Sequence, residues 1–188
     1  MNSLLLEPVW TAAAQARLYR AVLAAHAFPG EVVDCRAWLG GRPAAVGILA
    51  ALADGAVTLA EIDDILDPRE RSLVGAETAT VGEAAFVVAS GANAPADDLR
   101  LARGEIIAPE RGATLILVCV AVGEGPLRLS MSGPGIDGSA RLAVAGLDPR
   151  WIDLRTAHNR RPPLGIDLVL CDGARVVALP RTTVVEVT

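Results

Sequence analysis

The sequence predicts an α/β protein, a three-layer α/β/α sandwich with a mixed central sheet. Helical and strand patterns alternate along the first half of the chain, and strand patterns dominate from residue 84 onward. The continuous apolar run Leu115–Val122 is typical of a strand that is covered on both faces. With 188 residues, 52% of them hydrophobic, the chain can bury a sizeable core, so we expect residues 1–188 to form a single domain.

Helices are predicted from apolar side chains at helical spacing and from the residues that bound them. Phe28-Pro29-Gly30 ends the first helix, because proline cannot continue the backbone hydrogen bonds. Pro68 interrupts the acidic segment Glu61–Glu77, which predicts only a short helix with irregular flanks and leaves the layout of residues 61–81 open. The regular helices expected are Val9–Ala27, Pro43–Ala53 and Pro149–Asn159, with a single helical turn at Asp97–Arg103.

Strands are predicted where apolar or alternating runs lie between glycine and proline. Asp172-Gly173 is typical of a hairpin turn and joins two of these runs. Thr182–Val187 alternates and is rich in β-branched side chains, which predicts the final strand. The others expected are Glu31–Cys35, Ala56–Ala60, Ala85–Ala89, Thr114–Val122, Leu127–Met131, Ile166–Leu170 and Ala174–Leu179.

The composition excludes several kinds of chemistry. All 17 basic residues are arginine, so no lysine is present for a pyridoxal phosphate Schiff base, a Walker phosphate loop or a Ser-Lys dyad. We therefore expect no cofactor of this kind. The formal net charge of −5 argues against a nucleic acid partner, because phosphate neutralisation needs a basic face.

The cysteines and the apolar segments predict a soluble cytoplasmic protein without a membrane partner. Cys35, Cys119 and Cys171 are odd in number and form no Cys-x-x-Cys, so we expect no disulfide framework, and Cys119 should be buried. The longest apolar stretch, Ala113–Val122, is half of the roughly 20 residues that span a bilayer. Met1–Trp10 lacks the basic flank of a signal peptide.

The segment Gly133–Gly138 (GPGIDG) fits the dinucleotide fingerprint G-x-G-x-x-G, with Asp153 about 20 residues from its first glycine. Pro134 removes an amide from the loop, and Ser139–Leu147 is short for the helix that should follow. A tight turn is therefore the favoured interpretation. A nucleotide-binding loop and a small anion nest remain alternatives.

The titratable side chains give two further hypotheses. His26 and His158 lack partners at metal-ligand spacing, and His26 is expected to cap the end of a helix. The acidic residues are predicted to form solvated faces in preference to magnesium sites, and the arginines near His158 are predicted to lie at the surface, with phosphate or an acidic partner as an alternative contact. The acidic residues are Glu61, Asp63, Asp64, Asp97 and Asp98, and the arginines are Arg150, Arg155, Arg160 and Arg161.

Four blocks occur in order in the second half of the chain: Ala108–Leu117 (APERGATLIL), Leu129–Ile136 (LSMSGPGI), Pro163–Leu170 (PLGIDLVL) and Leu179–Val187 (LPRTTVVEV). They resemble the PhnH family, subunits of the bacterial carbon–phosphorus lyase system. The opening segment Arg17–Leu23 (RLYRAVL), with Phe28-Pro29-Gly30, is similar to the start of that family. The resemblance covers essentially the whole chain and is weakest near Glu61–Val81.

The resemblance implies a fold similar to the large domain of pyridoxal-phosphate transferases without the cofactor. It also implies a homodimer that joins the other core subunits of the lyase. Together they displace adenine from ATP by a phosphonate and form a ribose 1-phosphonate 5-triphosphate. The family provides no agreed catalytic residues, so none is assigned to this chain.

Two polar segments beside apolar strands are the candidate contacts with a ligand or a partner. They contain Ser132, Gly133 and Gly135, and Arg181, Thr182 and Thr183. We expect Arg181→Ala to weaken complex assembly or activity and to leave the fold intact. A non-catalytic subunit is the leading function; an autonomous nucleotide- or phosphonate-binding enzyme using Gly133–Gly138, and a regulatory protein descended from a cofactor enzyme, are the alternatives.

Overall fold

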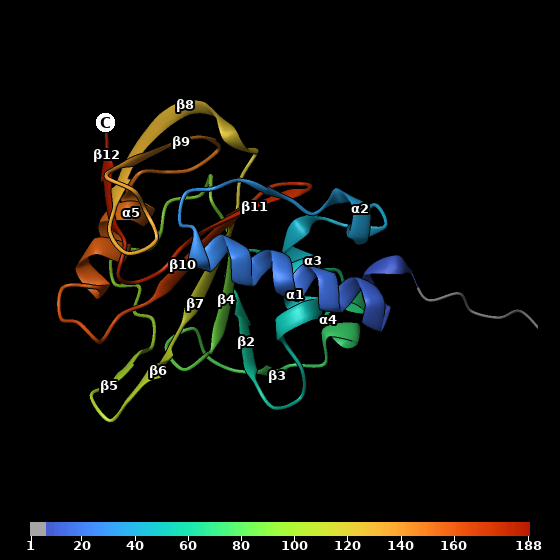
Figure 1. Cartoon of the computed structure of the whole chain (residues 1–188). Coiled ribbons are helices and arrows are strands. Elements are labelled where there is room, and N and C mark those ends of the chain that lie inside the picture. Colours follow the sequence, from blue (N-terminus) through green and yellow to red (C-terminus); the bar gives the residue numbers. More distant parts are fainter. Residues whose placement is uncertain (1–6) are drawn as a thin grey trace, which may run out of the picture.

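A seven-stranded mixed sheet forms the centre of the structure, a computed structural model that describes residues 7–188 (Figure 1). The five strands from β10 to β3 run parallel, whereas β11 and β1 are antiparallel to their neighbours. The predicted α/β class and mixed sheet are confirmed. The order is β1 (Val33–Asp34), β11 (Arg175–Leu179), β10 (Asp167–Cys171), β7 (Thr114–Val118), β4 (Phe86–Ser90), β2 (Thr58–Glu61) and β3 (Glu77–Thr78).

The strand β7 lies at the centre of this sheet and is buried on both faces. Leu115 and Leu117 pack into one core, and Ile116 packs into the core on the other face. This confirms the prediction for the apolar run. The run is nevertheless two strands, because Val120 donates its backbone N–H to Ala145 and the chain leaves the large sheet before β8 (Ala121–Ser132) begins.

Four helices cover one face of the sheet (Figure 1). The two predicted in this half are confirmed, and Thr11 accepts the N–H of Ala14 to cap the first. Gly47 allows close packing between helices, because a Cβ there would lie 3.3 Å from Leu18. The helices are α1 (Ala12–Ala27), α2 (Arg36–Leu39), which the sequence did not predict, α3 (Ala44–Leu52) and α4 (Pro68–Val74), preceded by the short 3-10 helix η1 (Pro8–Trp10).

The helix α4 lies in the segment whose layout the sequence left open. Pro68 begins this helix instead of interrupting it, since a missing N–H costs nothing in the first turn. Asp67 accepts the N–H of Glu70, and Glu70 accepts the N–H of Asp67, which completes a capping box. Gly75, at φ 70°, ends the helix before β3.

The other face of the sheet is covered mainly by strands. An antiparallel sheet of β12 (Val184–Val187), β8 and β9 (Ala140–Ala145) packs there together with α5 (Arg150–His158). Alternate side chains such as Leu129, Met131 and Val144 point into this core. The predicted helix α5 and strand β12 are confirmed. Since α5 is the one helix that the described residues place on this face, a helical third layer is not confirmed.

A two-stranded hairpin of β5 (Arg103–Glu105) and β6 (Ala108–Gly112) projects from the body (Figure 1). It replaces part of the predicted helical turn at Asp97–Arg103, which is only a reverse turn closed by Leu99 and Ala96. Ile106 and Ile107 at its tip are 79% and 90% exposed, so the segment lacks the alternation by which strands are predicted.

No helix within residues 7–188 has both the length and the apolar character to cross a membrane. The predicted hairpin between β10 and β11 is confirmed, with Asp172 and Gly173 in its turn. Most of the segment considered as a leader, Met1–Trp10, lies outside the described residues.

Candidate functional site

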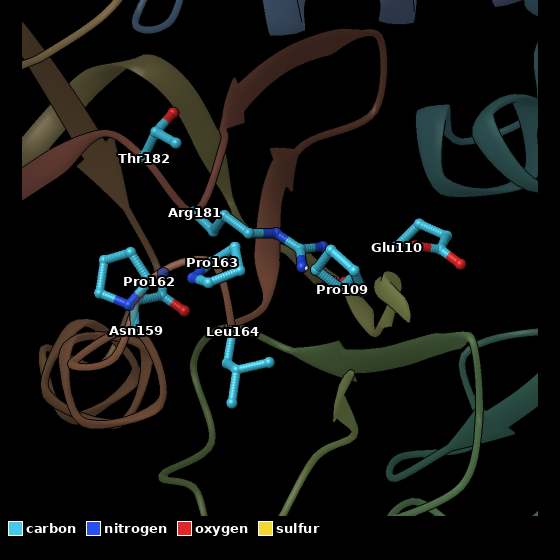
Figure 2. A pocket seen from close by; sticks show the side chains of 8 residues that line it. All are labelled: Pro109, Glu110, Asn159, Pro162, Pro163, Leu164, Arg181 and Thr182. Carbon is cyan, nitrogen blue, oxygen red and sulfur yellow. Dashed lines mark hydrogen bonds between the residues drawn. The ribbon is translucent and has the colours of Figure 1, made fainter. Parts of the chain in front are cut away.

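A pocket of about 300 Å³ lies beside the amino ends of β7 and β10 (Figure 2). Its walls come from β6, from the loop between α5 and β10, and from the turn between β11 and β12. Two of the six predicted contact residues, Arg181 and Thr182, line it. The remaining lining residues, which the sequence did not single out as a site, are Pro109, Glu110, Asn159, Pro162, Pro163 and Leu164.

Arg181 holds this pocket together. Its Nη2 donates to Asp167 Oδ2 at 2.6 Å, its Nε donates to Asp167 Oδ1 at 3.3 Å, and its Nη1 donates to the Pro109 carbonyl at 2.6 Å. The backbone N–H of Arg181 also donates to Asp167. The guanidinium is thus neutralised and tied to two elements. Our expectation that Arg181→Ala leaves the fold intact is therefore revised.

Two further side chains fix the walls of the pocket. Asn159 exchanges two hydrogen bonds with the backbone of Ile166, which closes the loop that carries the prolines. Arg155 Nη2 donates to the carbonyls of Pro180 and Thr183 at 2.6 and 2.9 Å, which closes the β11–β12 turn. The pocket is therefore built on rigid supports.

The structure brings most of the two predicted segments together. Ser132 pairs with Val184, and a Cβ on Gly133 would lie 3.0 Å from the Thr182 carbonyl oxygen. Thr182 is exposed, whereas Thr183 is 3% exposed and its hydroxyl has no hydrogen-bond partner among the described residues. Gly135 lies apart from Arg181, Thr182 and Thr183 and packs against the end of α1, where a Cβ on it would lie 2.8 Å from Pro29.

The segment Gly133–Gly138 is the turn of an antiparallel hairpin. It joins β8 to β9, and Ile136 donates its N–H to the Gly133 carbonyl at 3.1 Å. A dinucleotide loop must instead lead from a strand into a helix whose N-terminus receives the pyrophosphate. The tight-turn prediction is confirmed, and the geometry does not support the nucleotide-binding alternative.

The predicted arginine cluster around α5 is dispersed. Arg150 pairs with Asp148 at 2.9 Å. Arg155, expected at the surface, is 2% exposed, and burial lowers its pKa to about 10. That expectation was wrong because three carbonyls, from the end of β11 and from the turn that follows it, accept hydrogen bonds from its guanidinium. Arg160 and Arg161 are exposed.

The side chains of both histidines form hydrogen bonds with backbone groups. His158 Nδ1 donates to the Leu154 carbonyl, and Nε2 accepts the N–H of Leu101 at 3.2 Å, which fixes a neutral ring. Burial lowers the pKa of His158, and the nearby positive charges of Arg103 and Arg100 lower it further. His26 Nδ1 bonds to the Val22 carbonyl in the last turn of α1, as predicted.

The three cysteines and Asp172 are also part of the packed fold. The three thiols are free and buried, and burial raises the pKa of Cys35 to about 11 and that of Cys119 to about 12. Burial alone would raise the pKa of Asp172, but three backbone N–H groups and Arg175 outweigh it and lower the pKa. The Cys35 and Cys119 thiols, whose pKa is raised by burial, therefore stay protonated near neutral pH and are poor nucleophiles.

Two acidic residues predicted as solvated are instead bound. Glu61 is paired with Arg71, and Asp63 accepts the N–H of Ser90 and the amide of Asn93. Asp64, with Asp97 and Asp98, is exposed as expected. Within residues 7–188, no group of three His, Cys, Asp or Glu side chains is placed to hold a metal ion.

The pocket is suited to binding apolar groups. Three prolines and Leu164 are half of its eight lining residues, and the charge of its arginine is neutralised by Asp167. The exposed Ile106 and Ile107 lie at the tip of the hairpin whose second strand forms one wall. We call Ile106, Ile107, Pro109, Pro163 and Leu164 the hairpin surface. An apolar surface of this kind is typical of a contact with another protein.

Comparison with known proteins extends over nearly the whole described fold. The family model described as bacterial phosphonate metabolism protein (PhnH) matches residues 8–186. A protein of Stutzerimonas stutzeri named as a C-P lyase subunit, HtxG, is 37% identical over 175 residues, 93% of this chain and 87% of that protein. The alpha-D-ribose 1-methylphosphonate 5-triphosphate synthase subunit PhnH of Rhizobium meliloti (strain 1021) is 40% identical over 96 residues, 51% of this chain and 47% of that protein.

Proposed function

Because this chain belongs to the PhnH family of bacterial phosphonate metabolism proteins, we propose that it is a subunit of a carbon–phosphorus lyase assembly. The observation that carries the proposal is the family match over residues 8–186, which runs from η1 to β12. Both relatives are named as subunits of larger assemblies, one of a C-P lyase and one of a synthase. Other subunits of the same assembly are therefore the proposed partners.

The proposed role is to support formation of ribose 1-phosphonate 5-triphosphate from ATP and a phosphonate, with adenine as the leaving group. This reaction brings two anions together, so it requires positive charge and exact positioning. The side chains of this chain that could act as acids or bases largely form structural hydrogen bonds. His158 is hydrogen-bonded to two backbone groups, and Asp167 is bound by Arg181. A positioning role, without a catalytic residue or a pyridoxal phosphate aldimine, is thus the better supported one.

The hairpin surface is the proposed contact with a sibling subunit. Ile107 is 90% exposed, and its side chain would leave water on association, which favours binding by the hydrophobic effect. Thr182 and Glu110 supply a polar rim to the pocket. In isolation the chain is proposed to form a homodimer in the cytoplasm, with a fold that is similar to the large domain of pyridoxal-phosphate transferases.

The test is co-expression of the chain with the other lyase subunits, purification of the assembly, and an adenine-release assay with ATP and methylphosphonate. We expect the chain to co-purify, and its omission to reduce adenine release by at least tenfold. A variant with Arg17→Gln and Arg20→Gln on the exposed side of α1 is the matched control and should behave as the natural chain. An assembly that forms and releases adenine equally well without the chain would refute the proposal.

A further inference from the structure

A hollow of about 570 Å³ lies on the outer face of the three-stranded sheet β12–β8–β9 and shares no lining residue with the pocket of Figure 2. Two exposed arginines line it, Arg128 on β8 and Arg141 on β9. Ala143, opposite Arg128, has a small side chain and leaves space between them. The other lining residues are Gly123, Leu129, Ser130, Leu142 and Thr188.

The strand register places Arg128 and Arg141 on the same face of the sheet. Arg128 is paired with Ala143, and Ser130 is paired with Arg141, so the two arginines are diagonal neighbours on one face. Diagonal neighbours in an antiparallel pair lie about 7–8 Å apart, within reach of two long side chains. Ser130, beside both, adds a hydroxyl group to the same face. The pair is mounted on strands and not on a loop.

These two arginines are free of carboxylate partners among residues 7–188, where no ion pair within 4.0 Å includes either of them. Arg42, Arg150 and Arg181, by contrast, are each neutralised by acidic groups. No Asp or Glu lines the hollow. Glu186, which pairs with Ser130 from β12, is an acidic residue on the same face. Two arginine side chains against one glutamate side chain leave a net positive side-chain charge on this face, in a chain of net charge −5.

We propose that this hollow binds a polyphosphate group, such as the triphosphate of a nucleotide. A guanidinium group binds a phosphate through two parallel hydrogen bonds, so two arginines match two successive phosphate groups. The Ser130 hydroxyl donates a further hydrogen bond to the anion. The inference rests on the proposed function, since it assigns the triphosphate of that reaction to a surface of this chain. It involves no covalent step.

The experiment is isothermal titration of the isolated full chain with inorganic triphosphate, ATP and inorganic phosphate at low ionic strength. We expect saturable binding of triphosphate and ATP, and weaker binding of phosphate. Arg128→Gln and Arg141→Gln should each weaken triphosphate binding at least about tenfold. The double variant Arg128→Gln with Arg141→Gln should weaken triphosphate binding further. Arg17→Gln with Arg20→Gln, which also removes two positive charges but from α1, is the control for this double variant, and its binding should be unchanged.

A second variant gives a change in the opposite direction. Glu186→Gln removes a negative charge from the same face, and should tighten triphosphate binding about threefold. Absence of binding, equal binding by the double arginine variant, or equal affinity for phosphate and triphosphate would overturn the proposal. If binding fails while adenine release still depends on the chain, this inference is wrong and the proposed function stands; if the chain binds triphosphate but is dispensable for adenine release, the proposed function is wrong.

Discussion

Replacement of Arg181 by alanine tests whether this residue is primarily structural. The substitution removes the bidentate contact with Asp167 and the hydrogen bond to the Pro109 carbonyl. A hydrogen bond that involves a charged group contributes about 1.5–3 kcal/mol when buried. The two side chains are 18% and 21% exposed, which screens the pair, so the lower end of this range applies.

Counting the carboxylate pair once and the carbonyl contact once, we expect Arg181→Ala to lower the free energy of unfolding by about 3 kcal/mol. For a domain of this size the melting temperature should fall by roughly 6–12 °C. Urea unfolding followed by tryptophan fluorescence measures the change. Thr182→Ala, next to it and exposed, is the control and should change stability by less than about 0.5 kcal/mol. A loss below about 1 kcal/mol for Arg181→Ala would refute the structural role.

The other predictions concern the hairpin, a close contact and a histidine. Ile106→Asp with Ile107→Asp should abolish co-purification with sibling subunits and leave the urea midpoint unchanged, because both side chains are exposed; retained co-purification would count against the hairpin surface. Gly112→Ala should destabilise the fold by at least about 2 kcal/mol, since its Cβ would collide with the Gly165 carbonyl, whereas Gly173→Ala, with open space around it, should have little effect in the same urea assay. The pKa of His158 is lower in the folded state than its ordinary value of 6.5, because the fold holds the neutral ring. Above pH 6.5 the ring is neutral in both states and costs the fold nothing. As pH falls from 6.5 toward the folded pKa, the unfolded state binds a proton more readily and the free energy of unfolding decreases. As pH is lowered through this range, the urea midpoint of His158→Gln should therefore decrease less steeply than that of the natural chain. Equal slopes for the two proteins would contradict a lowered pKa of His158 in the folded state.

The fold was predictable where a pattern repeats over many residues. Helical spacing of side chains predicted α1 and α5, and the Asp172-Gly173 turn predicted the hairpin of β10 and β11. The hairpin of β5 and β6 was missed because exposed isoleucines at its tip give no alternation. The three-stranded sheet that packs on the second face of the central sheet was also missed. The alternating pattern of an amphipathic strand is the same whether the strand belongs to the central sheet or to a second one.

The candidate site was only partly predictable for a different reason. Arg181 and Thr182 were recognised as polar residues beside apolar strands, and they do line the pocket. Their partners Asp167 and Pro109 lie 14 and 72 residues away in sequence, and no local pattern relates such distant residues. Arg155 was placed at the surface because a charged residue normally lies there; its burial depends on the three carbonyls that surround it.

The central claim is that this chain contributes to a reaction that it does not perform alone. The most direct measurement is the rate of adenine release from ATP and methylphosphonate, per mole of chain, for the purified chain alone and for the chain combined with its sibling subunits. We predict no release above the uncatalysed background from the chain alone, and steady turnover that saturates with added chain when the siblings are present. Turnover by the chain alone at the rate of the full assembly would contradict the account.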